Sequence, residues 1–312
     1  MAWERYYHGD GTPRPGVRLP DPPRWRSFPR SSAGKMFLPP EGLVDVVNAA
    51  LRLRRPLLIT GAPGSGKSTV IEQVAQELNL GQVFRWHITS QSSLPDALYR
   101  YDALGRIHAQ RLRPDTLQED SIASFLQLGP LGSALAPADR PRALLVDEID
   151  KSDLDLPGDL LEVLERGEFE IPELVRENDD ADVDVRLWDS EQTSRVVRGR
   201  VQCTEFPFIV LTSNGEQEMS APFLRRCLRF EMPRPSPDML RGVIRGWLGM
   251  DVVDDSPAAA LIAEFVRRVE AGEKLAVDQL LSTVYLLVGE GAPEGEQRER
   301  LAQVLMRNLS GV

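Results

Sequence analysis

Hydrophobic residues recur along the chain in two patterns that predict two kinds of structure. Up to residue 232, short apolar runs alternate with stretches in which apolar residues recur at helical spacing. The runs predict buried strands at 56–60, 83–88, 143–148, 208–211 and 228–232. Helical spacing is found at 41–53, at 67–78 and after Pro157. This alternation is typical of an α/β fold, in which helices cover both faces of a parallel sheet.

Less regular patterns separate some of these strands. We expect a short helix at 94–99, a turn at Gly105 and a second helix at 119–128. Residues 168–206 predict a β-hairpin excursion with a solvated tip. The acidic run at 177–191 falls in this tip, and such a run is more often a solvated face than a binding site.

After Pro233 and Pro235 the pattern becomes entirely helical, so we place a domain boundary there. Four apolar stripes predict four helices, and we interpret the stripes as packing surfaces. Their members are Leu240, Val243, Ile244, Trp247 and Leu248; Ile262, Phe265, Val266 and Val269; Val277, Leu280, Leu281 and Val284; and Leu301, Val304, Leu305 and Leu309. The expected organisation is an α/β domain at 36–232 followed by a helical lid domain at 233–312.

Residues 1–35 form a third region, rich in proline and aromatic residues. The prolines exclude a helix and favour an extended arm. A flexible tail rarely contains many aromatic residues. This region contains Trp3, Tyr6, Tyr7, Trp25 and Phe28. We therefore predict an arm that packs on the body or on a neighbouring subunit; a disordered leader is the alternative.

A glycine-rich turn follows the first predicted strand. It consists of Gly61, Ala62, Pro63, Gly64, Ser65, Gly66, Lys67, Ser68 and Thr69. The spacing matches G-x-x-x-x-G-K-[ST], in which backbone N–H groups surround phosphate oxygens. Lys67 supplies a cation for the β and γ phosphates, and Ser68 supplies a hydroxyl that can bind Mg²⁺. The helix that follows adds the positive end of its dipole. The alternative is an ordinary glycine turn, but lysine is rare in this chain, which makes a chance match improbable.

Two predicted strands end in polar residues that suit the same chemistry. The strand at 143–148 ends in Asp147 and Glu148, and the strand at 208–211 leads to Asn214. Parallel strands present such residues at one edge of a sheet, where ligands bind. Asp147 is placed to hold Mg²⁺, directly or through water, and Glu148 to orient and deprotonate a water molecule. Asn214 is expected near the γ-phosphate.

Composition restricts the class of protein. The hydrophobic share of 42% and charged share of 27% are ordinary for a globular protein. We expect a cytoplasmic protein without a membrane segment, because no apolar run approaches about 18–20 residues. A net charge of −10 argues against a nucleic-acid partner, which needs a basic face. Cys203 and Cys227 lack zinc-ligand spacing and are expected to be buried or inert thiols.

The motifs, in this order, resemble those of the AAA+ ATPases, and most closely the MoxR-like family. The resemblance extends over about residues 36–290. The segments that support it are 61–68, 145–151, 157–164, 211–214 and 223–228. It implies a P-loop NTPase fold, with a five-stranded parallel sheet, helices on both faces and a helical lid. It also implies a ring of identical subunits, usually a hexamer, with ATP and Mg²⁺ bound between neighbours.

The resemblance also implies roles for individual residues. Lys67 and Ser68 would serve the phosphates and Mg²⁺, Asp147 and Glu148 would form the Walker B pair, and Asn214 would be the sensor 1 residue. These roles agree with those expected from the residues themselves.

Further residues have roles only through the resemblance. Arg226 resembles the arginine finger that reaches the next subunit's γ-phosphate, with Arg225 as its rival. A surface ion pair is the alternative for both. Residues 94–112 resemble the family's helix-2 insert and residues 168–206 its pre-sensor 1 hairpin, which face the pore or the substrate.

The predicted lid departs from the family pattern. Residues 274–281 align with a segment where many relatives place a sensor 2 arginine, and the nearest residue here is Asp278. Either Lys274 substitutes for it, or lid closure does not sense the γ-phosphate in the usual way.

The resemblance implies an enzyme that hydrolyses ATP to remodel or activate a protein client or adaptor. A nucleotide-dependent scaffold or switch with slow hydrolysis is the second hypothesis. Glu148 argues against it, because a switch benefits from losing the catalytic base. A DNA-associated AAA+ motor is the third, and the acidic composition argues against it.

Overall fold

The computed structural model describes residues 5–27, 37–112, 122–176, 182–289 and 291–309. The chain divides into two compact units. One consists of Pro39–Gly61 and Gly66–Met232, and the other of Met1–Leu38, Ala62–Ser65 and Pro233–Val312. We call the first the α/β unit and the second the helical unit.

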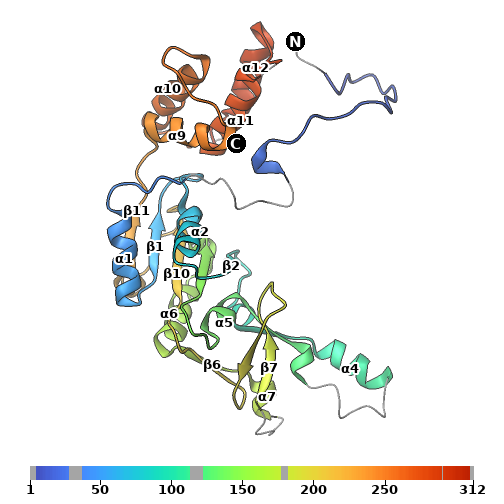
Figure 1. Cartoon of the computed structure of the whole chain (residues 1–312), viewed down its shortest axis with the longest axis vertical. Coiled ribbons are helices and arrows are strands. Elements are labelled where there is room, and N and C mark those ends of the chain that lie inside the picture. Colours follow the sequence, from blue (N-terminus) through green and yellow to red (C-terminus); the bar gives the residue numbers. More distant parts are fainter. Residues whose placement is uncertain (1–4, 28–36, 113–121, 177–181, 290, 310–312) are drawn as a thin grey trace. The chain divides into compact units, whose positions relative to one another are not determined.

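A five-stranded parallel sheet forms the centre of the α/β unit (Figure 1). Its strands, in spatial order, are β11 (Leu228–Glu231), β1 (Leu57–Thr60), β10 (Phe208–Ser213), β5 (Ala143–Asp147) and β2 (Val83–His87). Every neighbouring pair is parallel. The parallel sheet expected from the apolar runs is thereby confirmed.

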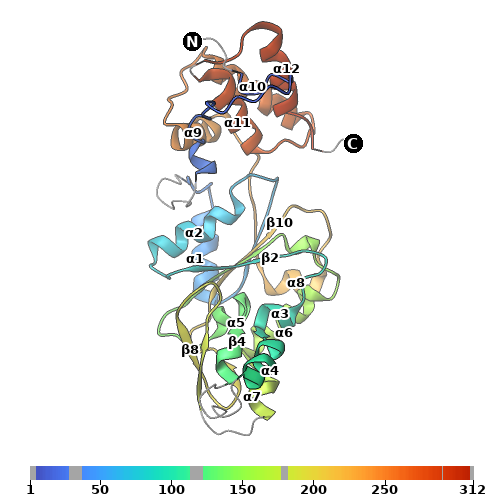
Figure 2. The same ribbon diagram turned by 90° about the vertical axis from the view of Figure 1, so that its right-hand side faces the viewer.

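Helices cover both faces of this sheet, which explains why its three central strands, β1, β10 and β5, are almost entirely buried (Figure 2). In the edge strands β2 and β11, exposed residues alternate with buried or half-buried ones. The helices are α1 (Leu43–Leu53), α2 (Lys67–Glu77), α3 (Leu94–Leu98), α5 (Pro130–Leu135), α6 (Leu156–Arg166) and α8 (Ala221–Arg226). Leu144 and Ile209 belong to a core cluster with side chains of α5 and α6. The next residues along their strands, Leu145 and Val210, are equally buried, and α2 contacts both β5 and β10.

The structure contradicts the predicted turn at Gly105. Helix α4 (Ala103–Leu112) runs through this glycine. Asp102 stabilises the start of the helix, because its Oδ1 accepts the N–H of Gly105 at 2.8 Å. A Cβ at this position would overlap that carboxylate, so the glycine leaves room for the cap instead of marking a turn.

The predicted helix at 119–128 is also wrong in the part that the structure describes. A short 3₁₀ helix, η3 (Ile122–Phe125), leads into β4 (Leu126–Leu128), which pairs antiparallel with β3 (Tyr99–Tyr101). Residues 119–121 lie outside the described residues. The helical spacing is a local signal, whereas pairing with β3 joins residues distant in sequence, and this tertiary contact determines the outcome.

Two antiparallel strand pairs form most of the excursion before β10. They are β6 (Glu168–Glu170) with β9 (Arg200–Gln202), and β7 (Val183–Arg186) with β8 (Thr193–Val196). Strand β7 also pairs with β4, so that β3, β4, β7 and β8 make a second sheet. A short helix, α7 (Pro172–Arg176), follows β6, and residues 177–181 of the acidic run lie outside the described residues.

Four helices form the core of the helical unit. They are α9 (Pro237–Leu248), α10 (Pro257–Glu270), α11 (Val277–Val288) and α12 (Gly295–Leu305). The side chains of Ser236 and Ser256 cap α9 and α10 by accepting backbone N–H groups. The first three predicted stripes supply the buried core of this unit. The fourth does not, because none of its members is buried: Leu301 and Leu305 are half-buried, Val304 is 70% exposed and Leu309 is 56% exposed.

Part of the N-terminal arm packs on the helical unit. Trp25 makes edge-to-face contacts with Trp247 and Tyr285, at ring-centroid distances of 6.4 and 5.6 Å. Such contacts contribute about 0.5–1.5 kcal/mol beyond the burial of area. Two other aromatic residues of the arm, Trp3 and Phe28, lie outside the described residues. Trp25 thus anchors the arm to its own chain.

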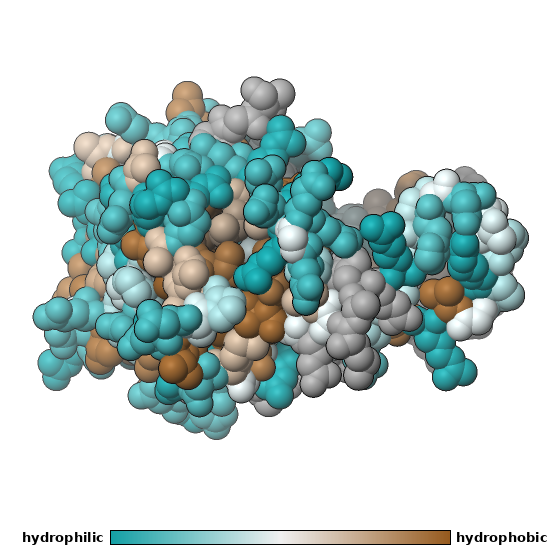
Figure 3. Space-filling view, turned by 90° about the horizontal axis from the view of Figure 1, so that it is seen from above, coloured by the Kyte–Doolittle hydropathy of each residue, from teal (hydrophilic) through white to brown (hydrophobic). Residues whose placement is uncertain are grey.

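On the face drawn in Figure 3, hydrophilic residues predominate and hydrophobic residues show in smaller groups between them. None of the helices in the described ranges combines the length and the apolar character that crossing a membrane requires.

The two cysteines are free thiols. Burial raises the pKa of the Cys227 thiol to about 12 and also raises the pKa of Cys203. Because the thiolate is the reactive form, both residues are poor nucleophiles, as expected from the sequence.

A pair of glycine substitutions tests the packing beneath the sheet. A Cβ on Gly132 of α5 would overlap the carbonyl oxygen of Leu98, whereas a Cβ on Gly158 of α6 would meet open space. We expect Gly132→Ala to lower the free energy of unfolding by about 1–3 kcal/mol. The matched Gly158→Ala should leave it unchanged or raise it by up to about 1 kcal/mol. Urea denaturation measures both, and equal effects would contradict the packing described here.

Candidate active site

The glycine-rich turn joins the end of β1 to the start of α2. Gly64 and Gly66 have φ angles of 74° and 87°, in a region that side chains with a Cβ rarely adopt. Gly66 is the N-cap of α2, so the free N–H groups of the first helical turn begin directly after it. Such a helix start binds anions through its N–H groups and its dipole, and the local geometry therefore fits a phosphate.

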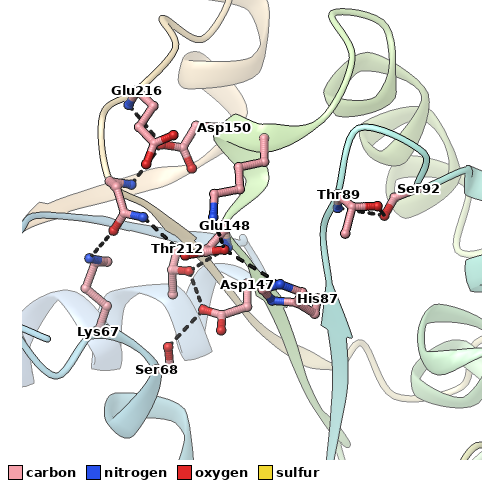
Figure 4. A network of polar contacts seen from close by, with 12 residues as sticks. Lys67, Ser68, His87, Thr89, Ser92, Asp147, Glu148, Asp150, Thr212 and Glu216 are labelled. Carbon is pink, nitrogen blue, oxygen red and sulfur yellow. Dashed lines mark hydrogen bonds and ion pairs between the residues drawn. The ribbon is translucent and has the colours of Figure 1, made fainter. Parts of the chain in front are cut away.

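Lys67 points into a cluster of polar side chains (Figure 4). Its Nζ donates to the carbonyl oxygen of Gly61 at 2.7 Å and to Oδ1 of Asn214 at 2.8 Å. Burial lowers the pKa of Lys67, and the negative charges of Asp147, Asp150 and Glu148 oppose this effect. The ammonium group is therefore held by neutral acceptors, which phosphate oxygens can replace.

Asp147, at the end of β5, joins the glycine-rich turn to the neighbouring strand. Its Oδ1 accepts hydrogen bonds from Ser68 Oγ at 2.8 Å and from Thr212 Oγ1 at 2.6 Å. A hydroxyl beside a single carboxylate suits Mg²⁺, which binds through one or two carboxylates together with phosphates and water. Within the described ranges no three or more His, Cys, Asp or Glu side chains gather as a metal site of protein ligands alone.

Glu148 follows with a backbone conformation that is unusual for its residue type. Its φ is 62°, in the left-handed region, and its N–H donates to Thr212 Oγ1 at 2.9 Å. Its carboxylate accepts from Lys151 Nζ at 2.7 Å and from Asn214 Nδ2 at 3.3 Å. His87 Nε2 lies 3.7 Å from the same carboxylate. The hydrogen bond to Glu148 raises the pKa of Lys151, because the contact favours the protonated form of the lysine.

Asn214 links these groups from the end of β10. Its amide accepts from Lys67 with Oδ1 and donates to Glu148 with Nδ2. The order β1, β10, β5 in the sheet explains this meeting, because parallel neighbours place their carboxyl ends at one edge. The structure thus brings together Lys67, Ser68, Asp147, Glu148 and Asn214.

The two arginines of α8 do not join this cluster. Arg226 is exposed and forms an ion pair with Glu165 of α6, which is the alternative that the sequence left open. The guanidinium of Arg55 donates to the backbone carbonyls of Arg225 and Arg226 and so fixes the end of α8. Among the described residues, the guanidinium of Arg225 makes no hydrogen bond or ion pair.

Asp278, which is nearest the expected sensor 2 position, and Lys274, its possible substitute, lie near the start of α11. Asp278 occupies its first turn. Lys274 precedes the helix, and its backbone N–H and carbonyl bond to Asn308 and Leu309. Both residues belong to the helical unit.

No site role was predicted from the sequence for four residues that contact this cluster. They are His87, Asp150, Lys151 and Thr212. Thr212 receives its role from strand pairing, since it lies beside Asp147 across the β5–β10 pair. A threonine that closes an otherwise apolar run is the only local signal for it.

The bridge made by Thr212 provides a test of this geometry. Thr212 is fully buried, so Thr212→Val leaves Asp147 without one donor and the N–H of Glu148 without its acceptor. We expect the free energy of unfolding to fall by about 1–3 kcal/mol. In the equally buried control Thr283→Val, the hydroxyl that is lost bonds only the carbonyl of Gln279 one turn earlier, and the loss should be below about 1 kcal/mol. Equal losses in urea denaturation would show that the bridge is not structurally important.

The family model described as the AAA domain (dynein-related subfamily) matches residues 56–227. No curated protein shows significant sequence similarity to the chain. Among similar solved structures is NtrX from Brucella abortus in complex with ADP, with 13% identity and a TM-score of 0.43, where the match covers 84% of this chain and 53% of NtrX. This chain therefore corresponds to about half the length of NtrX. Because the family match spans more than half of the chain, the protein belongs to the AAA domain family, in its dynein-related subfamily.

Proposed function

We propose that the protein is a MoxR-like AAA+ ATPase that hydrolyses ATP to remodel or activate a protein client. The observation that supports this most strongly is the hydrogen-bonded cluster of Lys67, Ser68, Asp147, Glu148 and Asn214. Binding alone would need only the glycine-rich turn and Lys67. A carboxylate and an amide placed beside the phosphate position are the groups that hydrolysis requires in addition.

The residues present fit ATP with Mg²⁺. Lys67 would exchange its bonds with Gly61 and Asn214 for bonds with phosphate oxygens. Ser68 Oγ and Asp147 Oδ1, 2.8 Å apart, would hold the metal ion. Bound Mg²⁺ supplies neutralisation of the charge on the β and γ phosphates.

Glu148 is the proposed general base. It would accept a proton from the water that attacks the γ-phosphorus, and Asn214 would hold that water in line. Lys151 contacts the same carboxylate, so it would compete with the attacking water for Glu148. The same contact favours a second candidate, a nucleotide-dependent switch that hydrolyses slowly.

A shared site between subunits is the remaining part of the proposal. Arg225 and Arg226 are exposed, and neither contacts the cluster of its own chain in the described structure. An arginine that stabilises the transition state in a neighbouring subunit would occupy such a position. We therefore propose a homo-oligomeric ring, a hexamer by resemblance, in which α8 faces the next nucleotide.

Glu148→Gln tests the proposed base. The substitution keeps the size of the side chain and its contact with Asn214 but removes the proton acceptor. We expect turnover to fall by about 10²–10⁴-fold, with ATP still bound and the ring stabilised. The control is Glu162→Gln on the exposed face of α6, where the carboxylate contacts Arg166.

Phosphate release, ATP binding and particle mass are measured for each protein. Turnover by Glu148→Gln equal to that of the wild type would exclude Glu148 as the base. A variant that retains ATP but stays monomeric would favour the switch.

Mixing two inactive variants tests the arginine finger. Arg226→Ala retains Lys67, and Lys67→Ala retains Arg226, so a mixed ring contains some complete sites if the arginine acts on its neighbour. We expect each variant to lose about 10³-fold or more in turnover and the mixture to recover part of it. Arg225→Ala is tested in the same way, with Arg166→Ala as the control.

The finger is the arginine whose loss is large and is restored by mixing. Mixed rings that show no recovery for either arginine would contradict a shared site.

A further inference from the structure

Asp150 is a buried carboxylate close to the proposed catalytic groups but outside their contacts with ATP. Its exposed fraction is 3%. It lies in the short 3₁₀ helix η4 (Ile149–Lys151), two residues after Glu148. Its Oδ2 accepts the backbone N–H of Asn214 at 2.9 Å and that of Glu216 at 3.0 Å (Figure 4).

The loop after β10 depends on side chains for its hydrogen bonds. Ser213 Oγ accepts the N–H of Gly215 at 3.0 Å, between the two N–H groups bound by Asp150. Three consecutive N–H groups are therefore satisfied by side chains and not by a neighbouring strand. Bonds from N–H groups to a charged carboxylate are stronger than bonds to neutral oxygens, so Asp150 is the main constraint on this loop.

The position of this loop determines where the amide of Asn214 lies. The backbone N–H of Asn214 is bound to Asp150, while its side chain bridges Lys67 and Glu148. Asp150 and Glu148 are close in the chain, and η4 joins them through the hydrogen bond from Lys151 N–H to Glu148 O at 2.9 Å. The base and the loop that holds Asn214 are thus attached to one rigid segment.

We propose that Asp150 is a positioning residue for ATP hydrolysis, which fixes Asn214 relative to Glu148 by binding the backbone of the loop after β10. The inference rests on the proposed ATPase function. Asp150 makes no contact with the reacting atoms and acts through Asn214. A displacement of about 1 Å in a catalytic group lowers rates by about 10²-fold, so a loose loop would reduce turnover without preventing nucleotide binding.

A double-substitution experiment separates this role from a general effect on folding. The variants are Asp150→Ala, Asp150→Asn, Asn214→Ala and the double variant Asp150→Ala with Asn214→Ala. Asp155→Ala is the matched control, because Asp155 lies on the same connection but is exposed and caps nothing with its side chain. For each protein, kcat, KM for ATP, ADP affinity and amide hydrogen exchange over residues 212–217 are measured.

We expect Asp150→Ala to lower kcat by about 10²-fold with little change in ADP affinity. Asp150→Asn keeps an oxygen that can accept both N–H groups, and should retain most of the activity lost in Asp150→Ala. The double variant should be no slower than Asn214→Ala alone, because both substitutions disable the same group. Exchange at Asn214 and Glu216 should accelerate in Asp150→Ala but not in Asp155→Ala.

Three results would overturn the inference. One is unchanged exchange at Asn214 and Glu216 in Asp150→Ala. Another is a double variant whose loss is the product of the two single losses, which would mean that Asp150 acts elsewhere. The third is an Asp150→Asn protein whose turnover is as slow as that of Asn214→Ala. This third result can be obtained even if Asp150→Ala does not fold.

Failure of the ATPase proposal itself has a different signature. In that case the wild type would release no phosphate, while the exchange data would still report whether Asp150 holds the loop.

Discussion

Parallel pairing of β1, β10 and β5 is the constraint on which the proposed site depends. Leu57 lies opposite Val210, and Val210 lies opposite Leu145. With this register the ends of the three strands come level, so that the glycine-rich turn, Asp147 and Asn214 leave the sheet at the same edge. A slip of one residue in β10 would turn Thr212 and Asn214 to the opposite face and separate them from Asp147 and Lys67.

The cluster at this edge contains both an ammonium group, that of Lys67, and carboxylates, those of Asp147, Glu148 and Asp150. Lys67 is paired with neutral oxygens, although its pKa is lowered by burial. Glu148 is paired with Lys151. Oδ2 of Asp150 accepts two backbone N–H groups, whereas its buried Oδ1 has no hydrogen-bond partner among the described residues. A bound nucleotide would therefore find a cation, a metal-binding pair and a carboxylate already in place. Such preorganisation lowers the reorganisation that a reaction requires.

Local sequence patterns were sufficient to predict those helices and strands whose structure does not depend on a particular partner strand. The apolar runs predicted all five strands of the sheet. For the central strands β1, β10 and β5 the reason is that a strand covered on both faces must be apolar. The glycine spacing and the acids after β5 predicted the residues that meet at the sheet edge. The turn at Gly105 and the described part of the helix at 119–128 were mispredicted. The second error arose because β3 and β4 depend on each other and not on their own periodicity. Thr212 and Asp150 stood in segments that support the resemblance, but no role was predicted for them, because their partners are known only once β5 and β10 are paired.

The central claim is that this sheet edge hydrolyses ATP. A single-turnover experiment tests it most directly: excess wild-type protein is mixed with γ-labelled ATP and Mg²⁺, and free phosphate is measured over time. The account predicts that bound ATP is converted to ADP and phosphate, and that chelation of Mg²⁺ stops the conversion. ATP that binds fully and is recovered intact, with and without Mg²⁺, would contradict it.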